Sequence, residues 1–533
     1  MQSPAGTTKA TFLYLAWSLA LSRYSDTGDV IFGLTLSGRQ ANVPGIDGMI
    51  GPTLATVPLR VQLEHENTVI SKLHQLQGQL AAMVPYEQLG LQNIRRLGAD
   101  AASACQFQNL LLVQPASAPS TDGFLLPIDG RGRAEAFGTY ALEVTCEPSA
   151  NETTITFDFD SRVIKHHQAQ RILSCYTHLL WQMQQDPNRR ISDLEFVSPS
   201  ARRELMEWNA VLPPAVDQFV HNGIHQQCLE SPDAPAVCAW DGDFTYRELD
   251  RVSSSFALHL RKLGIGPEIF VPICAEKLSW VAVAILGVIK AGGAVVLLDP
   301  KVPLERLRTV CQDVNAQIIV SSCNCADLAS QIASTVVIVG CDGLAQGESN
   351  APVLLASQFT PRNALYVIFT SGSTGKPKGI VIDHSAFYTS GREQQRPLYL
   401  DSSSRTLQFA SHMFDVAIAD YLWTFLAGGC LCIPSEDGLK NNLPGVVNEL
   451  RVNRIDMTPS LARVYRPEDM PTIETILLGG EPMSQVDVQM WASRVRLVNG
   501  YGPSECSVCC ILADVSADSD PSNIGNAYGT VAW

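Results

Sequence analysis

The order in which apolar strands, glycine turns and helices follow one another beyond residue 223 most constrains the fold. Residues 281–290 are predicted to form a helix, and residues 294–298 and 366–369 are predicted to form strands. Strands and helices that alternate in this way favour an α/β domain with a largely parallel sheet.

The part of the chain before residue 198 has a different pattern. Apolar strands such as residues 30–34 are mixed there with helix-like periodicity, and the apolar run at residues 12–21 is typical of a buried helix. A polar stretch with several prolines follows and is typical of an ordered linker. We therefore predict one domain at 1–198, a linker at 199–222 and a second domain at 223–533.

Composition and charge limit the classes of function. Hydrophobic residues make up 46% of the 533 residues and charged residues 17%, which is the profile of a core-forming chain. The formal charge is 38 − 53 = −15 and no Lys/Arg cluster occurs, so we expect no nucleic-acid partner.

Cysteines and apolar runs indicate the compartment. Most of the 15 cysteines lie in apolar runs, as buried thiols of a reducing compartment do, and the pair Cys506 and Cys509 is predicted to pack in the core. No run reaches ~18 apolar residues, because Lys290 and two glycines interrupt residues 282–298. The sequence predicts a cytoplasmic protein without a membrane partner.

The strongest chemical signal is the run YVIFTSGSTGKPKGI at residues 366–380. A short strand leads there into a loop with three glycines, four hydroxyls and two lysines. Glycines allow backbone N–H groups to approach phosphate oxygens, and hydroxyls and lysines add donors and positive charge. Pro377 stands where a Walker A loop needs Ser or Thr after Gly-Lys, so this is a phosphate loop of another kind.

This loop resembles the phosphate loop of the adenylate-forming enzymes. Five further segments, in the expected order, are similar to core motifs of adenylation domains in nonribosomal peptide synthetases: residues 244–249, 290–300, 414–415, 478–481 and 499–505. The resemblance covers residues 223–533 and implies the N-terminal core of the adenylate-forming fold.

The first domain also resembles a known family. Residues 30–61, 86–95 and 107–110 are similar to the C-terminal half of a fungal-type condensation domain, which implies a chloramphenicol acetyltransferase-like lobe. The family's His-His-x-x-x-Asp-Gly motif belongs to the N-terminal half, and His166-His167 lacks the Asp-Gly that would complete it. We expect these two histidines on the surface and no condensation by residues 1–198 alone.

The resemblance implies roles in ATP binding and catalysis. It assigns Thr370, Lys378 and Glu505 to catalysis, Glu505 also to Mg²⁺, Ser504 to the α-phosphate and Tyr501 to stacking on adenine. The whole implied nucleotide site consists of Thr370, Ser371, Gly372, Ser373, Thr374, Gly375, Lys378, Gly480, Glu481, Asn499, Gly500, Tyr501, Gly502, Ser504 and Glu505.

The implied substrate pocket consists of Asp415, Val416, Ala419, Asp456, Leu477, Gly479, Gly500, Val508 and Cys509. In the family an acid at Asp415 pairs with the substrate α-ammonium, which favours an α-amino acid. Asp456 is unusual in a pocket that is otherwise apolar, because a buried carboxylate needs a cation or hydrogen-bond donors. We interpret it as favouring arginine, ornithine or lysine, with the alternative that Asp456 turns into a local hydrogen-bond network.

The function implied is activation of an amino acid with ATP, giving aminoacyl-AMP and pyrophosphate, with the carrier (thiolation) domains of a parent synthetase as partners. Phosphopantetheine is expected only on a carrier domain absent from this chain. The family's ribose-binding acid and lysine-bearing C-terminal subdomain also lie past residue 533, so we expect an incomplete AMP-forming ligase. Two alternatives stay open: another acyl- or aryl-acid ligase, and a fragment that only binds nucleotide.

Overall fold

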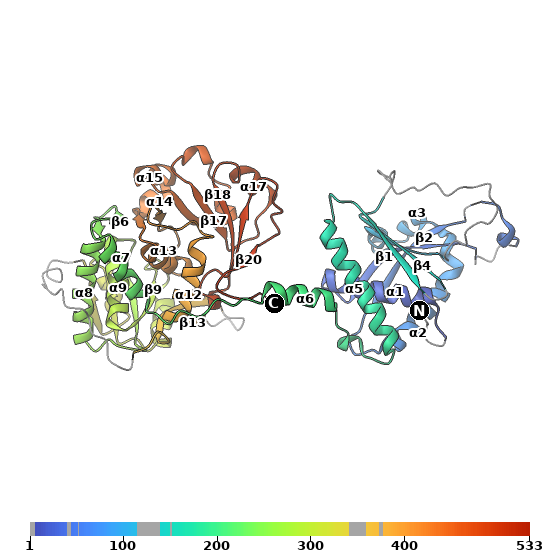
Figure 1. The fold of residues 1–533 in the computed structure, drawn as a ribbon, viewed down its shortest axis with the longest axis horizontal. Coiled ribbons are helices and arrows are strands. Elements are labelled where there is room, and N and C mark those ends of the chain that lie inside the picture. The colour runs from blue at the N-terminus through green and yellow to red at the C-terminus, as the bar shows by residue number, and fades with distance from the viewer. Residues whose placement is uncertain are drawn as a thin grey trace. The chain divides into compact units, whose positions relative to one another are not determined.

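The computed structural model of this chain describes residues 6–39, 44–51, 53–114, 139–149, 152–340, 359–371 and 377–532. The chain divides into two compact units, Met1–Ala210 (unit 1) and Val211–Trp533 (unit 2). Figure 1 labels many of their helices and strands.

Unit 1 is built on a five-stranded sheet in the order β2-β1-β3-β4-β5. The pairs β1–β3 and β3–β4 are parallel, and the two edge pairs are antiparallel. The strands are β1 (Asp29–Leu36), β2 (Ala55–Gln62), β3 (Asn109–Val113), β4 (Leu142–Pro148) and β5 (Thr153–Phe159). The helices are α1 (Lys9–Ser25), α2 (Val69–Met83), α3 (Leu91–Arg95), α4 (Ala99–Ala104), α5 (His166–Gln185) and α6 (Pro199–Trp208), with short 3-10 turns η1 (Ile46–Gly48), η2 (Val84–Leu89) and η4 (Ile191–Asp193).

Helix α1 is the buried helix that the apolar run at residues 12–21 predicts. Thr8 caps its N-terminus by accepting a hydrogen bond from the Thr11 N–H, and the helix is buried without interruption from Thr11 to Ala20. It packs against α5, whose first residues His166 and His167 are exposed, as expected. Helix α6 lies within the predicted linker and has no buried residue.

Unit 2 contains two sheets of mostly parallel strands. The six-stranded sheet has the order β11-β10-β8-β9-β12-β13, and only its last pair is antiparallel. Its strands are β8 (Phe270–Cys274), β9 (Ala294–Leu298), β10 (Ile318–Ser321), β11 (Thr335–Ile338), β12 (Ala364–Ser371) and β13 (Pro377–Asp383). The predicted strands at 294–298 and 366–369 are β9 and part of β12.

The nine-stranded sheet has the order β20-β19-β18-β17-β16-β14-β15-β6-β7. Its strands from β18 to β6 are parallel, and those at the edges are antiparallel. Its strands are β6 (Pro235–Ala239), β7 (Phe244–Thr245), β14 (Arg405–Leu407), β15 (Cys430–Ile433), β16 (Arg454–Met457), β17 (Thr475–Gly479), β18 (Arg496–Tyr501), β19 (Ile511–Val515) and β20 (Asn526–Ala527). Figure 1 shows β17 and β18 side by side.

Helices connect the strands of unit 2, as the alternating pattern predicts. They are α7 (Val220–Glu230), α8 (Tyr246–Lys262), α9 (Ser279–Ala291), α10 (Leu304–Asp313), α11 (Ala326–Ser330), α12 (His384–Gln395), α13 (Asp415–Leu426), α14 (Glu436–Asn441), α15 (Leu443–Glu449), α16 (Pro459–Ala462) and α17 (Gln485–Trp491), with 3-10 turns η6 (Pro467–Asp469) and η7 (Ser504–Cys506). The α/β architecture with a largely parallel sheet is therefore confirmed.

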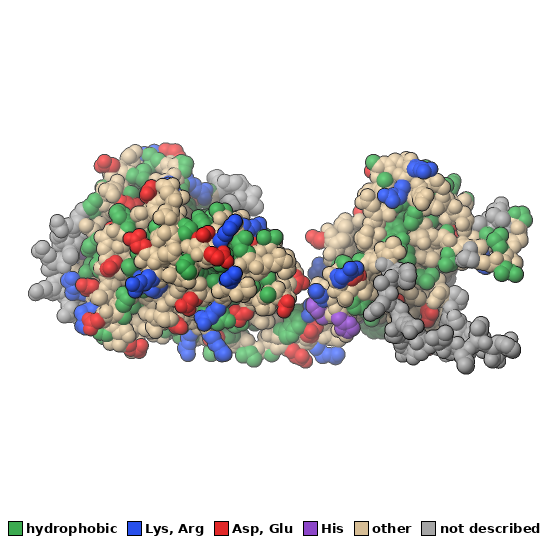
Figure 2. Space-filling view, turned by 90° about the horizontal axis from the view of Figure 1, so that it is seen from above, with side chains coloured by type: hydrophobic (Ala, Val, Ile, Leu, Met, Phe, Trp, Pro, Cys, Tyr) green, Lys and Arg blue, Asp and Glu red, His purple; other side chains and the backbone are tan. Residues whose placement is uncertain are grey.

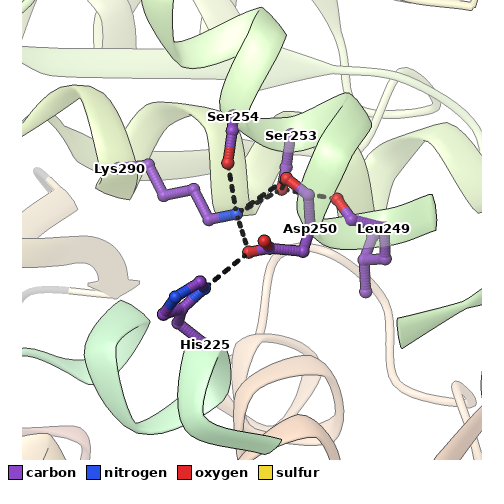
Figure 3. A network of polar contacts seen from close by, with 6 residues as sticks. All are labelled: His225, Leu249, Asp250, Ser253, Ser254 and Lys290. Atoms are coloured by element: carbon purple, nitrogen blue, oxygen red, sulfur yellow. Dashed lines mark hydrogen bonds and ion pairs between the residues drawn. The ribbon is translucent and has the colours of Figure 1, made fainter. Parts of the chain in front are cut away.

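Lys290, which interrupts the apolar run of α9, is buried between α8 and α9 (Figure 3). Its Nζ donates to the carboxylate of Asp250 at 2.7 Å and to the hydroxyls of Ser253 and Ser254 at 2.7 and 3.0 Å. His225 contacts the same carboxylate at 3.2 Å. The charge that breaks the apolar pattern is thus paired inside the unit.

Two further observations concern the surface. On the face shown in Figure 2, Lys and Arg side chains are interspersed with Asp and Glu. None of the helices in the described ranges is long and apolar enough to cross a membrane.

Candidate active site

A cavity of about 390 Å³ opens at the carboxyl ends of β16, β17 and β18, beside the N-terminus of α13. Ligand sites in parallel α/β sheets form at this edge, because loops diverge there and leave space. The register places Asp456 beside Leu477 and Gly479 beside Gly500, so residues that are far apart in sequence meet at one edge.

Eight of the nine predicted substrate-pocket residues line this cavity. They are Asp415, Val416, Asp456, Leu477, Gly479, Gly500, Val508 and Cys509. Ala419 does not line it, because it lies one helical turn after Asp415 and is fully buried in α13. Its small side chain therefore acts on the packing behind the cavity and not on the space inside it.

Asp415 is the first residue of α13, where the helix dipole favours a negative charge. Burial raises the pKa of its carboxyl, and hydrogen bonds from the Ser504 hydroxyl and from backbone N–H groups oppose that rise. The predicted partner of the α-ammonium therefore lies next to Ser504, the predicted partner of the α-phosphate. A carboxylate so placed is suited to a cation that enters with the substrate.

Asp456 is paired within the protein, which agrees with the alternative of a local hydrogen-bond network and not with the interpretation that it waits for a basic substrate. Nη2 of Arg454 donates to its two oxygens at 2.8 and 3.1 Å, and both side chains are buried, with 3% and 6% exposed. The two residues are i and i+2 on β16, so their side chains share one face of the strand. The i, i+2 spacing could have predicted from sequence that Arg454 pairs with Asp456. That prediction requires residues 454–457 to be recognised as a strand.

Four predicted nucleotide-site residues line this cavity: Gly480, Glu481, Gly502 and Gly500, which is predicted for both sites. The Glu481 carboxylate accepts hydrogen bonds from the Ser460 N–H at 3.0 Å and hydroxyl at 2.8 Å, which lowers its pKa. Tyr501 ends β18 with half of its side chain exposed, which leaves its ring accessible to a base. Asn499 is buried.

The described residues of the phosphate-loop run lie on strands of the other sheet of unit 2. Thr370 near the end of β12 pairs with Lys378 of β13, and β13 contacts the turn η7 that carries Ser504 and Glu505. Residues Gly372, Ser373, Thr374 and Gly375 lie outside the described residues, as does the side chain of Ser371.

Glu505 is exposed on η7, and a single carboxylate that acts together with substrate phosphates is the usual protein contribution to a Mg²⁺ site. Glu505 therefore fits the predicted role. In the described parts of the chain no group of three or more His, Cys, Asp or Glu side chains gathers as a metal site. The neighbouring Cys506 is exposed, so the predicted core packing holds for Cys509 but not for Cys506.

Sequence reasoning did not find the remaining lining residues, which are Phe409, Ala410, Ser411, Phe414, Met457, Thr458 and Leu461. Phe414 and Met457 directly adjoin predicted site residues, which was a usable signal. Phe409 to Ser411 follow β14, and only the strand order places them beside β16.

Unit 2 has the adenylate-forming fold, as comparisons with known proteins show. Residues 224–532 match the family model for AMP-binding enzymes, and residues 1–206 match that for condensation domains. The chain therefore belongs to the AMP-binding enzyme family, and a match to condensation domains precedes that domain along the chain.

Similar curated proteins are fungal synthetases. The nonribosomal peptide synthetase atnA of Emericella nidulans is 40% identical over 99% of this chain, and N-benzoylphenylalaninol synthetase apmA of Penicillium brevicompactum is 40% identical over all of it. The chain spans only 7% and 22% of those proteins.

Solved structures with the same fold include two nonribosomal peptide synthetases. Holo-AB3403, bound to AMP and glycine, matches with a TM-score of 0.76 and 19% identity, over 98% of this chain and 40% of that one. FmoA3 in its AMPPNP-bound form matches with a TM-score of 0.73 and 20% identity, over 98% and 57%.

Proposed function

We propose that unit 2 activates the carboxylate of an α-amino acid with ATP. A carboxylate oxygen of the substrate attacks the α-phosphorus and forms an oxygen–phosphorus bond. The bond from the α-phosphorus to the bridging oxygen breaks, and pyrophosphate leaves with the electron pair. The products are aminoacyl-AMP and pyrophosphate.

The observation that carries this proposal is the position of Asp415. Its carboxylate lines the cavity next to Ser504, and burial raises the pKa of this carboxyl. An α-ammonium bound there would place the substrate carboxylate next to the residue proposed for the α-phosphate. Such alignment of the reacting atoms contributes strongly to catalysis.

The remaining roles are part of the same proposal. Thr370 and Lys378 hold the phosphates, Tyr501 stacks on adenine beside Gly480 and Glu481, and Glu505 holds Mg²⁺, which would neutralise phosphate charge. The contact of β13 with η7 supports this grouping, because it brings the strand of Lys378 to the turn of Glu505.

The wider setting is also proposed. We infer that 1–198 and 223–533 are the two domains, with 199–222 as linker, in a cytoplasmic synthetase. Its carrier domains would take the aminoacyl group on phosphopantetheine, as the resemblance of residues 223–533 to adenylation domains of nonribosomal peptide synthetases implies.

Three alternatives have weaker support. If the substrate were a hydroxy or aryl acid, the Asp415 carboxylate would have no cationic partner. If the chain bound only nucleotide, the cavity lined by Asp415 would have no amino-acid ligand. A basic substrate side chain was inferred on the assumption that Asp456 is unpaired, and Arg454 removes that support.

The test is amino-acid-dependent exchange between ATP and pyrophosphate, measured on this chain and on a version extended at its C-terminus. We expect exchange by the extended protein and its loss in Asp415→Asn. The matched control is Asp518→Asn, which changes an exposed acid of the same unit. Exchange that survives Asp415→Asn would contradict the assigned role, and silence from a well-folded extended protein would favour nucleotide binding alone.

A further inference from the structure

The feature that carries a further inference is Arg454, which stands behind the cavity and does not line it. Its guanidinium is fixed at both ends: Nη2 donates to the two oxygens of Asp456, and Nη1 donates to the carbonyl oxygen of Leu398 at 2.7 Å. Arg454 therefore reaches the cavity only through the carboxylate that it holds.

The ion pair of Arg454 and Asp456 presents no net charge to a substrate. Arginine stays protonated in proteins, so the Asp456 carboxylate enters the cavity already neutralised. The cavity that Asp456 lines also has apolar walls, which include Val416, Met457, Leu461 and Leu477. A lysine or ornithine side chain would lose its hydration there and would meet the positive guanidinium behind Asp456.

The charged groups behind the cavity do not change this balance. Asp420 of α13 is buried, and burial together with Asp456 holds the pKa of its carboxyl well above the usual range. The nearby Lys277 donates to the carbonyl oxygens of Gln408, Phe409 and Ala410. If Asp420 is ionised, Lys277 offsets its charge, and if Asp420 is neutral, no negative charge is added.

We propose that Arg454 is a specificity-determining positioning residue: by neutralising Asp456 it restricts the cavity to α-amino acids with uncharged, largely apolar side chains. The proposal rests on the proposed function and deepens it by naming the substrate class. Arg454 acts through Asp456 and does not touch the substrate.

The experiment measures equilibrium binding of aminoacyl sulfamoyl adenosines to the whole chain by calorimetry. These compounds mimic the aminoacyl-adenylate and are not hydrolysed, so catalysis is not needed. The leucyl and phenylalanyl compounds are compared with the lysyl and ornithyl compounds. We expect the wild-type protein to bind the best neutral compound roughly 100-fold more tightly than either basic one.

Arg454→Met retains a long apolar side chain and removes the charge. We expect the ratio of basic to neutral affinity to rise at least about tenfold, because Asp456 then faces the cavity without a partner. Arg454→Lys keeps a cation and is expected to keep the wild-type preference. In the double variant Arg454→Met/Asp456→Asn the preference for neutral compounds should return.

Specific results would overturn the proposal. Tighter binding of a basic compound by the wild-type protein would do so without any variant, which covers the case in which Arg454→Met does not fold. Equal weakening of all compounds in a folded Arg454→Met protein would show a purely structural role. Binding of ATP without binding of any aminoacyl compound would instead reject the proposed function.

Discussion

At the scale of the residue, Asp415 illustrates a conflict between stability and binding. Burial raises the pKa of its carboxyl, so the ionised form is destabilising in the empty protein. That cost is fully present above the raised folded pKa, declines as pH falls from the folded pKa towards the unfolded pKa, and is absent below the unfolded pKa. A bound α-ammonium would remove the conflict, because it supplies the missing cation.

This conflict predicts a pH dependence. The ionised carboxylate binds the α-ammonium, so amino-acid affinity should weaken as pH falls through the raised pKa of Asp415, above the range of an ordinary carboxyl. The measurement is the amino-acid KM of the exchange reaction between pH 5 and 8. Asp415→Asn should show no exchange at any pH in this range, and a flat wild-type profile would contradict the prediction.

Gly502 belongs to the same scale, and its role is spatial. A Cβ added there would lie 2.6 Å from the Cα of Cys509 and closer still to the carbonyl oxygen of Val508. Both atoms belong to the backbone and cannot turn aside. Glycine is therefore needed at this position because these backbone atoms leave no room for a side chain.

We predict that Gly502→Ala weakens ATP binding at least about tenfold, because the turn that carries Ser504 and Glu505 must move. Titration calorimetry with ATP and Mg²⁺ would measure it. Gly266→Ala is the matched control, since nothing lies within 4 Å of the added Cβ and its φ is not positive. Unchanged affinity in Gly502→Ala would show that the turn is free to adapt.

At the scale of the element, the pair α8 and α9 shows how one polar residue is accommodated in an apolar helix. Burial lowers the pKa of Lys290, and Asp250 opposes that shift. The ammonium keeps four contacts to α8: the Asp250 carboxylate and carbonyl oxygen and the hydroxyls of Ser253 and Ser254. Helix α8 thus supplies every contact to Lys290 that Figure 3 draws.

We predict that Asp250→Ala lowers the free energy of unfolding of unit 2 by about 3 kcal/mol, because it leaves the Lys290 ammonium buried without a counter-charge. Lys290→Met should cost less, since Asp250 is 24% exposed and keeps His225 as a neighbour. Urea denaturation measures both.

The control is Asp233→Ala, which removes an exposed ion pair between Asp233 and Arg247, a residue of α8. This change should alter the free energy of unfolding by less than about 1 kcal/mol. A loss in Lys290→Met as large as in Asp250→Ala would contradict this ordering.

At the scale of the whole molecule, the two units have separate cores. In unit 1, Trp17 is fully buried, contacts the rings of Phe157 and Tyr176, and donates from Nε1 to Asn109 at 3.1 Å. In unit 2, Phe425 of α13 is fully buried in a different cluster. Separate cores allow the units to unfold separately.

We therefore predict two calorimetric unfolding transitions. Trp17→Ala should lower the temperature of the unit 1 transition, because it reduces the free energy of unfolding of that unit by about 3–5 kcal/mol. The amino-acid affinity of unit 2 should stay unchanged. Phe425→Ala should lower the other transition. A single transition that both variants shift equally would contradict independent units.

Much of the fold and site could be predicted from sequence because the signals were local. The apolar strand at 366–369, the helix at 281–290 and the motif residues Asp415 and Gly500 each stand in a short pattern that suffices to place them. Ala419 shows the limit, since helical spacing alone does not tell whether a residue faces a cavity or the packing behind it.

The sequence alone determined the alternation of strands and helices and the family, because these depend on residue type and spacing. Tertiary structure decided the charge of the cavity. Arg454 and Asp456 are two residues apart, yet their pairing and burial require β16 to lie between β14 and β17, with the Leu398 carbonyl oxygen brought from 56 residues away. Whether a buried carboxylate selects a cation depends on such neighbours, which no local pattern contains.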